Sequence, residues 1–137
     1  MRGPSAAQWF RMTFALNGWS GDWLGSVHEW HHYHMNTHEV LGVVSGAARL
    51  QFDGPQGRVE TVHAGDAIVI PAACAHCLIE ATDDFEVIGA YPGGLRPDIH
   101  NGSGAIAPFP LPVRRDPILG AGRGFVLHIG QAGVLQG

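Results

Sequence analysis

Three side chains that commonly bind metal ions lie close together in the first third of the sequence. His32 and His34 are two residues apart, and an extended backbone would place both imidazoles on the same face. Glu39 follows five residues after His34, so a short bend would direct all three side chains to one point. Two imidazoles and one carboxylate, with room for water, form a ligand set that suits Fe(II), Mn, Ni or Zn. The spacing therefore predicts a site for one divalent metal ion.

The elements that must position these residues have the pattern of β-strands. Residues 39–45 alternate, and we expect Glu39, Leu41 and Val43 to share the inward face. Short strands at spacings of roughly 8–12 residues, separated by turn residues, are typical of an all-β sandwich or barrel. No segment shows a sustained helical period of apolar residues. Further strands are predicted at residues 47–52, 58–63, 67–70, 76–80 and 85–91.

The N-terminal part is less regular. We expect residues 1–12 to be a weakly ordered lead-in and residues 13–16 to form an edge strand. Residues 17–22 contain turn residues, and residues 23–30 can be extended although they alternate poorly.

The C-terminal part changes in composition. Residues 92–124 are rich in Pro and Gly, which indicates a long loop over the surface or across a barrel mouth. Residues 125–129 could be a last strand or a docking segment. The length fits a single domain over residues 1–137, with a barrel at about residues 13–92 and an extension at 93–137.

The sequence resembles the cupin superfamily in its first motif, which has the form His-x-His, three or four residues, Glu, six residues, Gly. His32, His34, Glu39 and Gly46 meet this spacing, while the Gly that opens the motif is offset by one residue, at Gly25. The resemblance implies the cupin double-stranded β-helix, a jelly-roll barrel of the RmlC-like kind.

The second cupin motif is also present, with two departures. Gly65, Pro71 and His76 match Gly, five residues, Pro-x-Gly, two residues, His, three residues, Asn. Ala73 stands in place of the second Gly, a mild change if the turn tolerates a Cβ, and Glu80 replaces Asn. The resemblance implies that His76 is a further metal ligand, beside His32, His34 and Glu39.

A narrower resemblance, to the bacterial YjlB-type cupins, spans about residues 14–100. It rests on residues 31–34, 38–42, 65–66, 83–85 and 89–92. It implies a small single-domain protein and no particular reaction, because a fold does not determine a function.

Several functions fit this site. The first is a metal-dependent enzyme that acts on a small molecule in the barrel, either an O2-dependent oxidoreductase or an isomerase or lyase, with Glu39 as a base. The alternative is a non-catalytic barrel that binds or senses a small molecule, and a third is a barrel without metal. Glu39 could also be an acceptor that orients a ligand imidazole.

Other reactive side chains have simpler interpretations. His31 and His38 should point away from the ligands, His28 and His63 read as ordinary strand residues, and His100 could cap the mouth. Cys74 and Cys77 flank His76, but a redox pair normally sits at a helix N-terminus, so packing is the better interpretation. Arg49 and Gln51 would line the cavity if they point inward and would be solvated if they point outward, and we favour the outward orientation.

Composition excludes several classes. The net charge is -4, and all eight positive residues are scattered Arg without a basic stripe, so no nucleic-acid partner is expected. The chain has no Lys, which excludes Schiff-base chemistry. No apolar run approaches the ~20 residues of a membrane span and no signal peptide is visible, so we expect a cytoplasmic protein. Uncovered sheet edges favour a homodimer, with the N-terminal strand and residues 125–129 as contributors.

Overall fold

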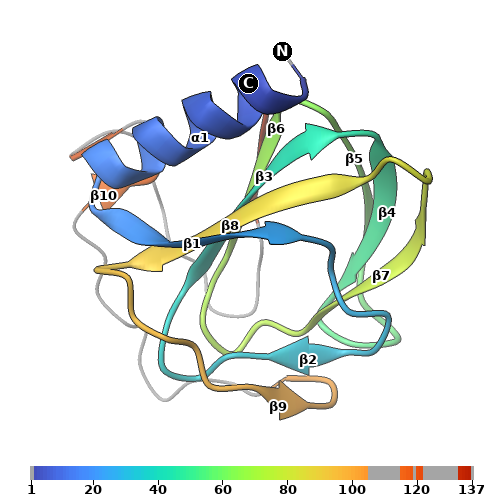
Figure 1. Ribbon diagram of the computed structural model, residues 1–137. Coiled ribbons are helices and arrows are strands. Elements are labelled where there is room, and N and C mark those ends of the chain that lie inside the picture. Colours follow the sequence, from blue (N-terminus) through green and yellow to red (C-terminus); the bar gives the residue numbers. More distant parts are fainter. Residues whose placement is uncertain (1, 105–114, 119, 122–132, 137) are drawn as a thin grey trace.

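The computed structural model describes residues 2–104, 115–118, 120–121 and 133–136, and within them the chain forms two antiparallel five-stranded sheets (Figure 1). The first sheet contains, in spatial order, β1 (Trp19–Gly25), β8 (Glu86–Pro92), β3 (Glu39–Ser45), β6 (Asp66–Ile70) and β12 (Gly133–Gln136). The second contains β5 (Val59–His63), β4 (Ala47–Phe52), β7 (His76–Ala81), β2 (His32–Tyr33) and β9 (His100–Asn101). The predicted all-β jelly-roll barrel is confirmed.

The central strands agree with the sequence pattern. β3 and β4 have the predicted bounds, and β5 to β8 differ from prediction by a residue or two at their ends. β6 begins one residue early because the Asp66 carboxylate accepts a hydrogen bond from the His63 backbone N–H at 2.8 Å, which closes the turn between β5 and β6. Strong alternation and turn residues therefore located most of the barrel correctly.

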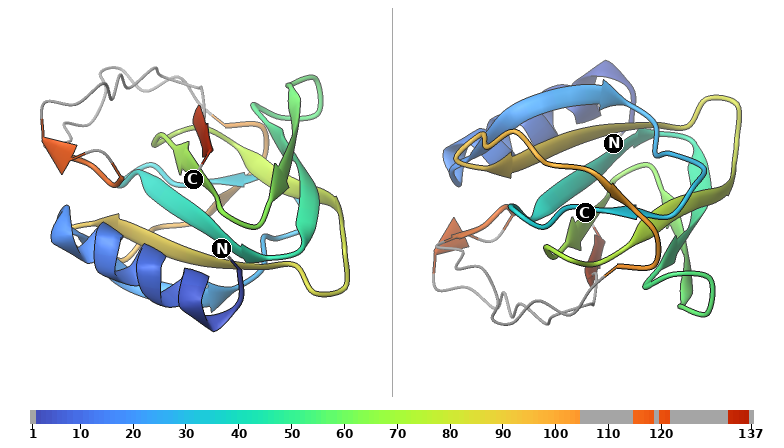
Figure 2. Two further views of the ribbon diagram at one scale, coloured as in Figure 1. Left: turned by 90° about the horizontal axis from the view of Figure 1, so that it is seen from above. Right: turned by 90° about the horizontal axis from the view of Figure 1, so that it is seen from below.

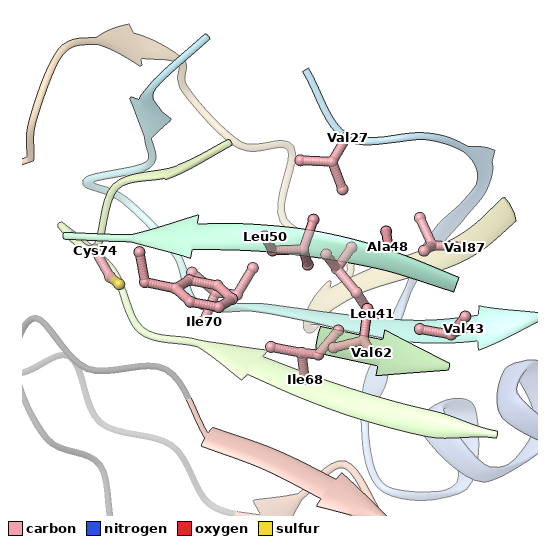
Figure 3. Packing of buried hydrophobic residues seen from close by; sticks show 11 residues of the cluster. Val27, Leu41, Val43, Ala48, Leu50, Val62, Ile68, Ile70, Cys74 and Val87 are labelled. Carbon is pink, nitrogen blue, oxygen red and sulfur yellow. The ribbon is translucent and has the colours of Figure 1, made fainter. Parts of the chain in front are cut away.

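The space between the sheets is filled by one apolar cluster (Figure 3). Leu41 and Val43 of β3 point into it, as predicted, and meet Leu50 of β4 and Ile68 of β6. Each of these side chains is at most 1% exposed. Their burial supplies the rigid framework on which the polar end of the barrel is built.

The N-terminal segment is a helix, α1 (Pro4–Leu16), so the prediction of a lead-in and of an edge strand at residues 13–16 was wrong. Pro4 stands at the first turn, where its missing N–H costs nothing. The helix packs across β1, β3 and β8 (Figures 1 and 2). It buries one stripe of four residues: Ala6, Ala7, Phe10 and Phe14. The outer face of β3 and β8 is apolar and needs this cover, which the strand pattern alone did not reveal.

The segment after α1 also differs from prediction. The turn expected over residues 17–22 is shorter, because β1 already begins at Trp19, which is 1% exposed. The register of β1 against β8 shifts between Ser20 and Trp23. The extended segment expected at residues 23–30 leaves the sheet after Gly25.

The segment that follows β8 was predicted as a loop, and its described part contains regular pairing. β9 adds an edge to β2, on the side of the barrel away from α1 (Figures 1 and 2). β10 (Arg115–Asp116) and β11 (Gly120–Ala121) form a separate two-stranded ladder. Residues 125–129, which we expected to be a last strand or a docking segment, lie outside the described residues, and so does His128.

The helix changes one expectation about the homodimer. The N-terminal strand that was expected to contribute to a homodimer is a helix, so that contribution is withdrawn, and the homodimer itself stays a prediction. The single domain over residues 1–137 also stays a prediction. Over the described residues, no helix has the length and apolar character needed to cross a bilayer.

Candidate metal centre

Three buried imidazoles meet at one end of the barrel. His32 of β2 lies directly opposite His76 of β7 in the ladder, and their ring centroids are 4.1 Å apart. His34 follows His32 by two residues, and its ring centroid is 5.4 Å from that of His76. One nitrogen from each ring lies within 4.8 Å of the other two. The cross-strand pairing therefore brings together residues that are far apart in sequence.

Each of the three imidazoles is oriented by a backbone carbonyl. The Nδ1 atoms of His32, His34 and His76 lie 3.1, 2.6 and 3.1 Å from the carbonyl oxygens of Trp30, Asp98 and Cys74. A carbonyl oxygen only accepts, so each Nδ1 must carry the proton and donate it. In the neutral form of each ring, Nε2 then carries the free lone pair, which is the tautomer that a metal ligand needs.

Glu39 reaches this cluster from the other sheet. Its Oε1 lies 3.6 Å from His34 Nε2 and 3.3 Å from His76 Nε2, and the residue is 3% exposed. Burial raises the pKa of this carboxyl, but hydrogen bonds from His34 and His76 outweigh burial and hold the pKa well below its usual range. The structure thus places an ionised carboxylate beside two of the three Nε2 atoms.

The histidines respond differently to the same surroundings. Burial, followed by the charge of His76, lowers the pKa of His32 to about 4, so its Nε2 is unprotonated at neutral pH. Burial also lowers the pKa of His34, but the hydrogen bond and the charge of Glu39 outweigh it and raise the pKa above its ordinary value. A divalent cation among these groups would replace that proton and balance the carboxylate.

Two further side chains hold Glu39 in place. The Tyr91 hydroxyl donates to Glu39 Oε2 at 2.7 Å and accepts from the indole Nε1 of Trp23 at 2.8 Å. Trp23 lies directly opposite Gly89 in the ladder, and a Cβ at Gly89 would be 2.4 Å from the indole ring. Gly89 therefore makes room for the ring that positions Tyr91, and Tyr91 fixes the second oxygen of Glu39.

A segment from the C-terminal half, residues 95–101, supports His34. Besides the carbonyl contact, the Asp98 carboxylate accepts from the Met35 backbone N–H at 2.8 Å, and His100 stacks on Tyr33. The side chain of Asn36 donates to the Arg96 carbonyl and accepts from the Asp98 N–H, both at 3.0 Å. We call residues 95–101 the strap, because this segment follows β8 and holds the residues at the end of β2.

The Asn36 contacts lead to a testable expectation. Asn36→Ala removes both hydrogen bonds of its side chain to the strap, so the Asp98 carbonyl should hold His34 less firmly. Losing support behind a ligand typically costs 10–100-fold in metal affinity, and we expect a Zn(II) dissociation constant about tenfold higher. Competition with a chromophoric chelator measures it. Gln51→Ala is the matched control, since that amide also makes two contacts to loop carbonyls away from the site, and an equal loss there would contradict a specific role of the strap.

A cavity of about 330 Å³ opens above the cluster. His32, His34, Glu39 and His76 form its polar end, with Tyr91 beside them. The remaining lining comes from β1 and the segment after it, from β3 and from the strap. A small molecule could therefore reach the imidazoles and the carboxylate directly.

The other histidines among the described residues lie outside the cluster. His38 is buried and accepts from the Ala72 N–H at 2.8 Å, and the Nε2 of His31 lies 3.5 Å from the Cys77 sulfur. His63 is an exposed strand residue, as predicted. His28 was predicted to be an ordinary strand residue but lies outside the strands, lines the cavity mouth and stacks on Trp30. His100 does not line the cavity, although its neighbour Ile99 does.

The other sequence interpretations are confirmed. Cys74 and Cys77 are free and buried, and burial raises the pKa of each thiol, which suits packing rather than redox chemistry. Arg49 points outward and pairs with Glu80 at 3.2 Å on the surface. Gln51 also points away from the cavity, toward the loop after β4.

Ala73 occupies a conformation that favours glycine. Its φ is 73°, and its N–H donates to the His34 carbonyl at 2.7 Å, so the turn before β7 is tied to His34. A left-handed backbone costs a non-glycine residue roughly 1–2 kcal/mol, while glycine loses about 0.5–1 kcal/mol more chain entropy on folding.

We therefore expect Ala73→Gly to leave stability unchanged or to raise it by up to about 1 kcal/mol. Ala75→Gly, at a fully buried position without a positive φ, should instead destabilise by about 1 kcal/mol. Urea denaturation of the metal-free proteins compares them. If both variants lost the same stability, the turn would not be strained at Ala73.

Comparison with known proteins agrees with the fold and the site. Residues 23–88 match the family described as Cupin domain, and the two-sheet fold agrees with that match. It is similar to the "Uncharacterized protein YjlB" of Bacillus subtilis (strain 168), with 48% identity over 86 residues, which cover 63% of this chain and 52% of that protein. The chain spans about half the length of this curated relative. The resemblance to YjlB-type cupins is thereby confirmed.

Proposed function

We propose that the chain binds one divalent metal ion through the Nε2 atoms of His32, His34 and His76, with the Glu39 carboxylate as the fourth ligand. The observation that carries the proposal is that the three imidazoles converge while each Nδ1 lies within hydrogen-bond distance of a backbone carbonyl, which leaves Nε2 for the ion. Three neutral imidazoles and one carboxylate suit Fe, Ni, Mn or Zn, so the donor set fits such an ion without selecting among them.

We propose further that the site acts on a small molecule in the cavity, as a metal-dependent oxidoreductase that uses O2 or as an isomerase or lyase. A bound divalent ion would supply Lewis-acid chemistry, or O2 chemistry if it is iron. Tyr91 holds Oε2 of Glu39, so Oε1 could partly release the ion and accept a proton from a bound molecule. The cavity gives that molecule direct access to the cluster.

Turnover distinguishes this proposal from a barrel that only binds its ligand. Protein loaded anaerobically with Fe(II) is mixed with an oxygenated buffer that contains a 1,3-diketone, a thiol or a phenol. Oxygen uptake is followed with an electrode. Zn(II)- or Mn(II)-loaded protein is tested for isomerase and lyase products. Turnover that disappears in His76→Ala supports an enzyme. Tight binding of the same compounds without any turnover would favour the binding or sensing function.

A further inference from the structure

The upper walls of the cavity differ sharply from its polar end. Trp23, Val27, Leu41, Pro97 and Ile99 surround the space above the ligands. Val27 and Leu41 also belong to the core cluster between the sheets, so the cavity is continuous with the apolar interior. A charged group placed against these walls would lose its hydration without gaining a partner, which costs several kcal/mol.

Among the described residues, no Arg or Lys side chain lines this cavity. Apart from the imidazoles, Glu39 is the one charged side chain of the described lining, and the sequence contains no Lys. Arg49 lies on the outer face of its sheet, paired with Glu80. The Asp98 carboxylate accepts from the backbone N–H groups of Met35 and Asn36 and lies 3.3 Å from the His100 Nε2.

The charges at the polar end leave room for one negative group. A divalent ion carries two positive charges, and a Glu39 carboxylate bound to it cancels one of them. Because Glu39 Oε1 lies beside the Nε2 atoms of His34 and His76, where the ion would bind, one positive charge remains, and one anionic oxygen of a bound molecule can balance it. Beyond the cluster, a second carboxylate, a phosphate or a sulfate would find only the Ser26 hydroxyl and the His28 imidazole among the described walls, and no Arg or Lys.

The cavity also limits the size of the ligand. At roughly 30 Å³ for each water-sized unit, a volume of about 330 Å³ holds on the order of ten non-hydrogen atoms. We infer that the cavity selects a small chelating molecule with at most one negative charge and an apolar or aromatic remainder, and that it rejects dianions. The inference deepens the proposed function and rests on it, because the metal is the anchor of the chelating group.

Matched chelators test this selectivity. Acetylacetone and malonate both chelate through two oxygens in a six-membered ring, but malonate is a dianion at neutral pH. Benzoylacetone adds a phenyl ring to the same chelating group. The protein is loaded with Co(II), and each compound is titrated while the visible absorption bands of Co(II) are recorded. Metal content after gel filtration shows whether the ion stays bound.

For each compound, the affinity for the Co(II)-loaded protein is divided by its affinity for aqueous Co(II). On this scale we expect benzoylacetone to bind at least about tenfold more tightly than acetylacetone, because its phenyl ring is buried. Malonate should bind at least about tenfold more weakly than acetylacetone on the same scale. Malonate binding as tight as that of acetylacetone, or no gain from the phenyl ring, would overturn the inference.

A variant of the strap tests the missing cation directly. Ile99 lines the cavity and is 57% exposed, so Ile99→Arg can be accommodated without disrupting the core. The new guanidinium should raise malonate affinity about tenfold and leave acetylacetone affinity within threefold. Ile79→Arg, at a 47% exposed position outside the cavity lining, should change neither. If Ile99→Arg leaves malonate binding unchanged, the inference is wrong.

The experiments distinguish failure of the metal site from failure of the inferred selectivity. If Co(II), Zn(II) and Fe(II) are all lost on gel filtration, the proposed metal site is wrong, and the inference falls with it. If the metal stays bound and the dianion is preferred, the metal site stands and the inferred selectivity alone is wrong.

Discussion

Replacing either His32 or His76 with alanine should abolish metal binding. Structural zinc sites bind with about 10–16 kcal/mol, so loss of one ligand among four costs about 3 kcal/mol, which is more than 100-fold in affinity. His32 and His76 are cross-strand neighbours whose Nδ1 atoms are both anchored, so neither can be replaced by a nearby side chain without breaking the ladder geometry. Metal content of each purified variant, measured after loading and gel filtration, should fall below about a tenth of an equivalent.

The control for this experiment is His63→Ala. The His63 side chain is 66% exposed on β5 and lies outside the cluster, so the variant should bind metal like the parent chain. Circular dichroism of the metal-free proteins separates loss of a ligand from loss of the fold. Folded His32→Ala or His76→Ala protein that retains a full equivalent of metal would contradict the assignment.

Glu39→Gln should have a comparably large effect, because it removes the negative charge and keeps the shape of the side chain. The amide oxygen can still accept from the Tyr91 hydroxyl, so the local packing survives. If Glu39 is a ligand, we expect Zn(II) affinity to fall at least about 100-fold, measured by chelator competition. Tyr91→Phe keeps the carboxylate and removes only its support, and should cost about tenfold.

The size of the Glu39 effect decides between two roles. Glu60→Gln serves as the control, since the Glu60 side chain is 40% exposed on the edge strand β5. Zn(II) affinity within threefold of the parent protein in Glu39→Gln would assign Glu39 to orienting the imidazoles of His34 and His76. That outcome would leave three histidines as the protein's contribution to the metal.

The parts of the fold that were predicted from sequence are those with strong local patterns. β3 alternates cleanly between a core face and an outer face, and Ser45 and Gly46 mark its end, so its bounds were found. The helix was missed because Trp9, Met12 and Leu16 are apolar yet 40–82% exposed, which blurs the difference between its buried and exposed sides.

The ligands were predictable, and most of their supports were not. His32, His34, Glu39 and His76 follow family spacings, and the structure brings all four side chains together. The anchoring of His34 depends on the backbone carbonyl of Asp98, and a carbonyl contact between distant segments has no signature in side-chain types. Tyr91 could have been placed near Glu39 only if the pairing of β3 with β8 had been known, since Val40 lies opposite Ala90.

The central claim is that this barrel holds one metal ion, and elemental analysis of the purified protein tests it most directly. The protein is analysed as isolated and again after chelation, anaerobic reloading with Fe(II) or Zn(II), and gel filtration. The account predicts about one equivalent of Fe, Ni, Mn or Zn per chain in at least one of these preparations, and none in His76→Ala. A folded protein that retains no metal under any of these conditions would contradict it.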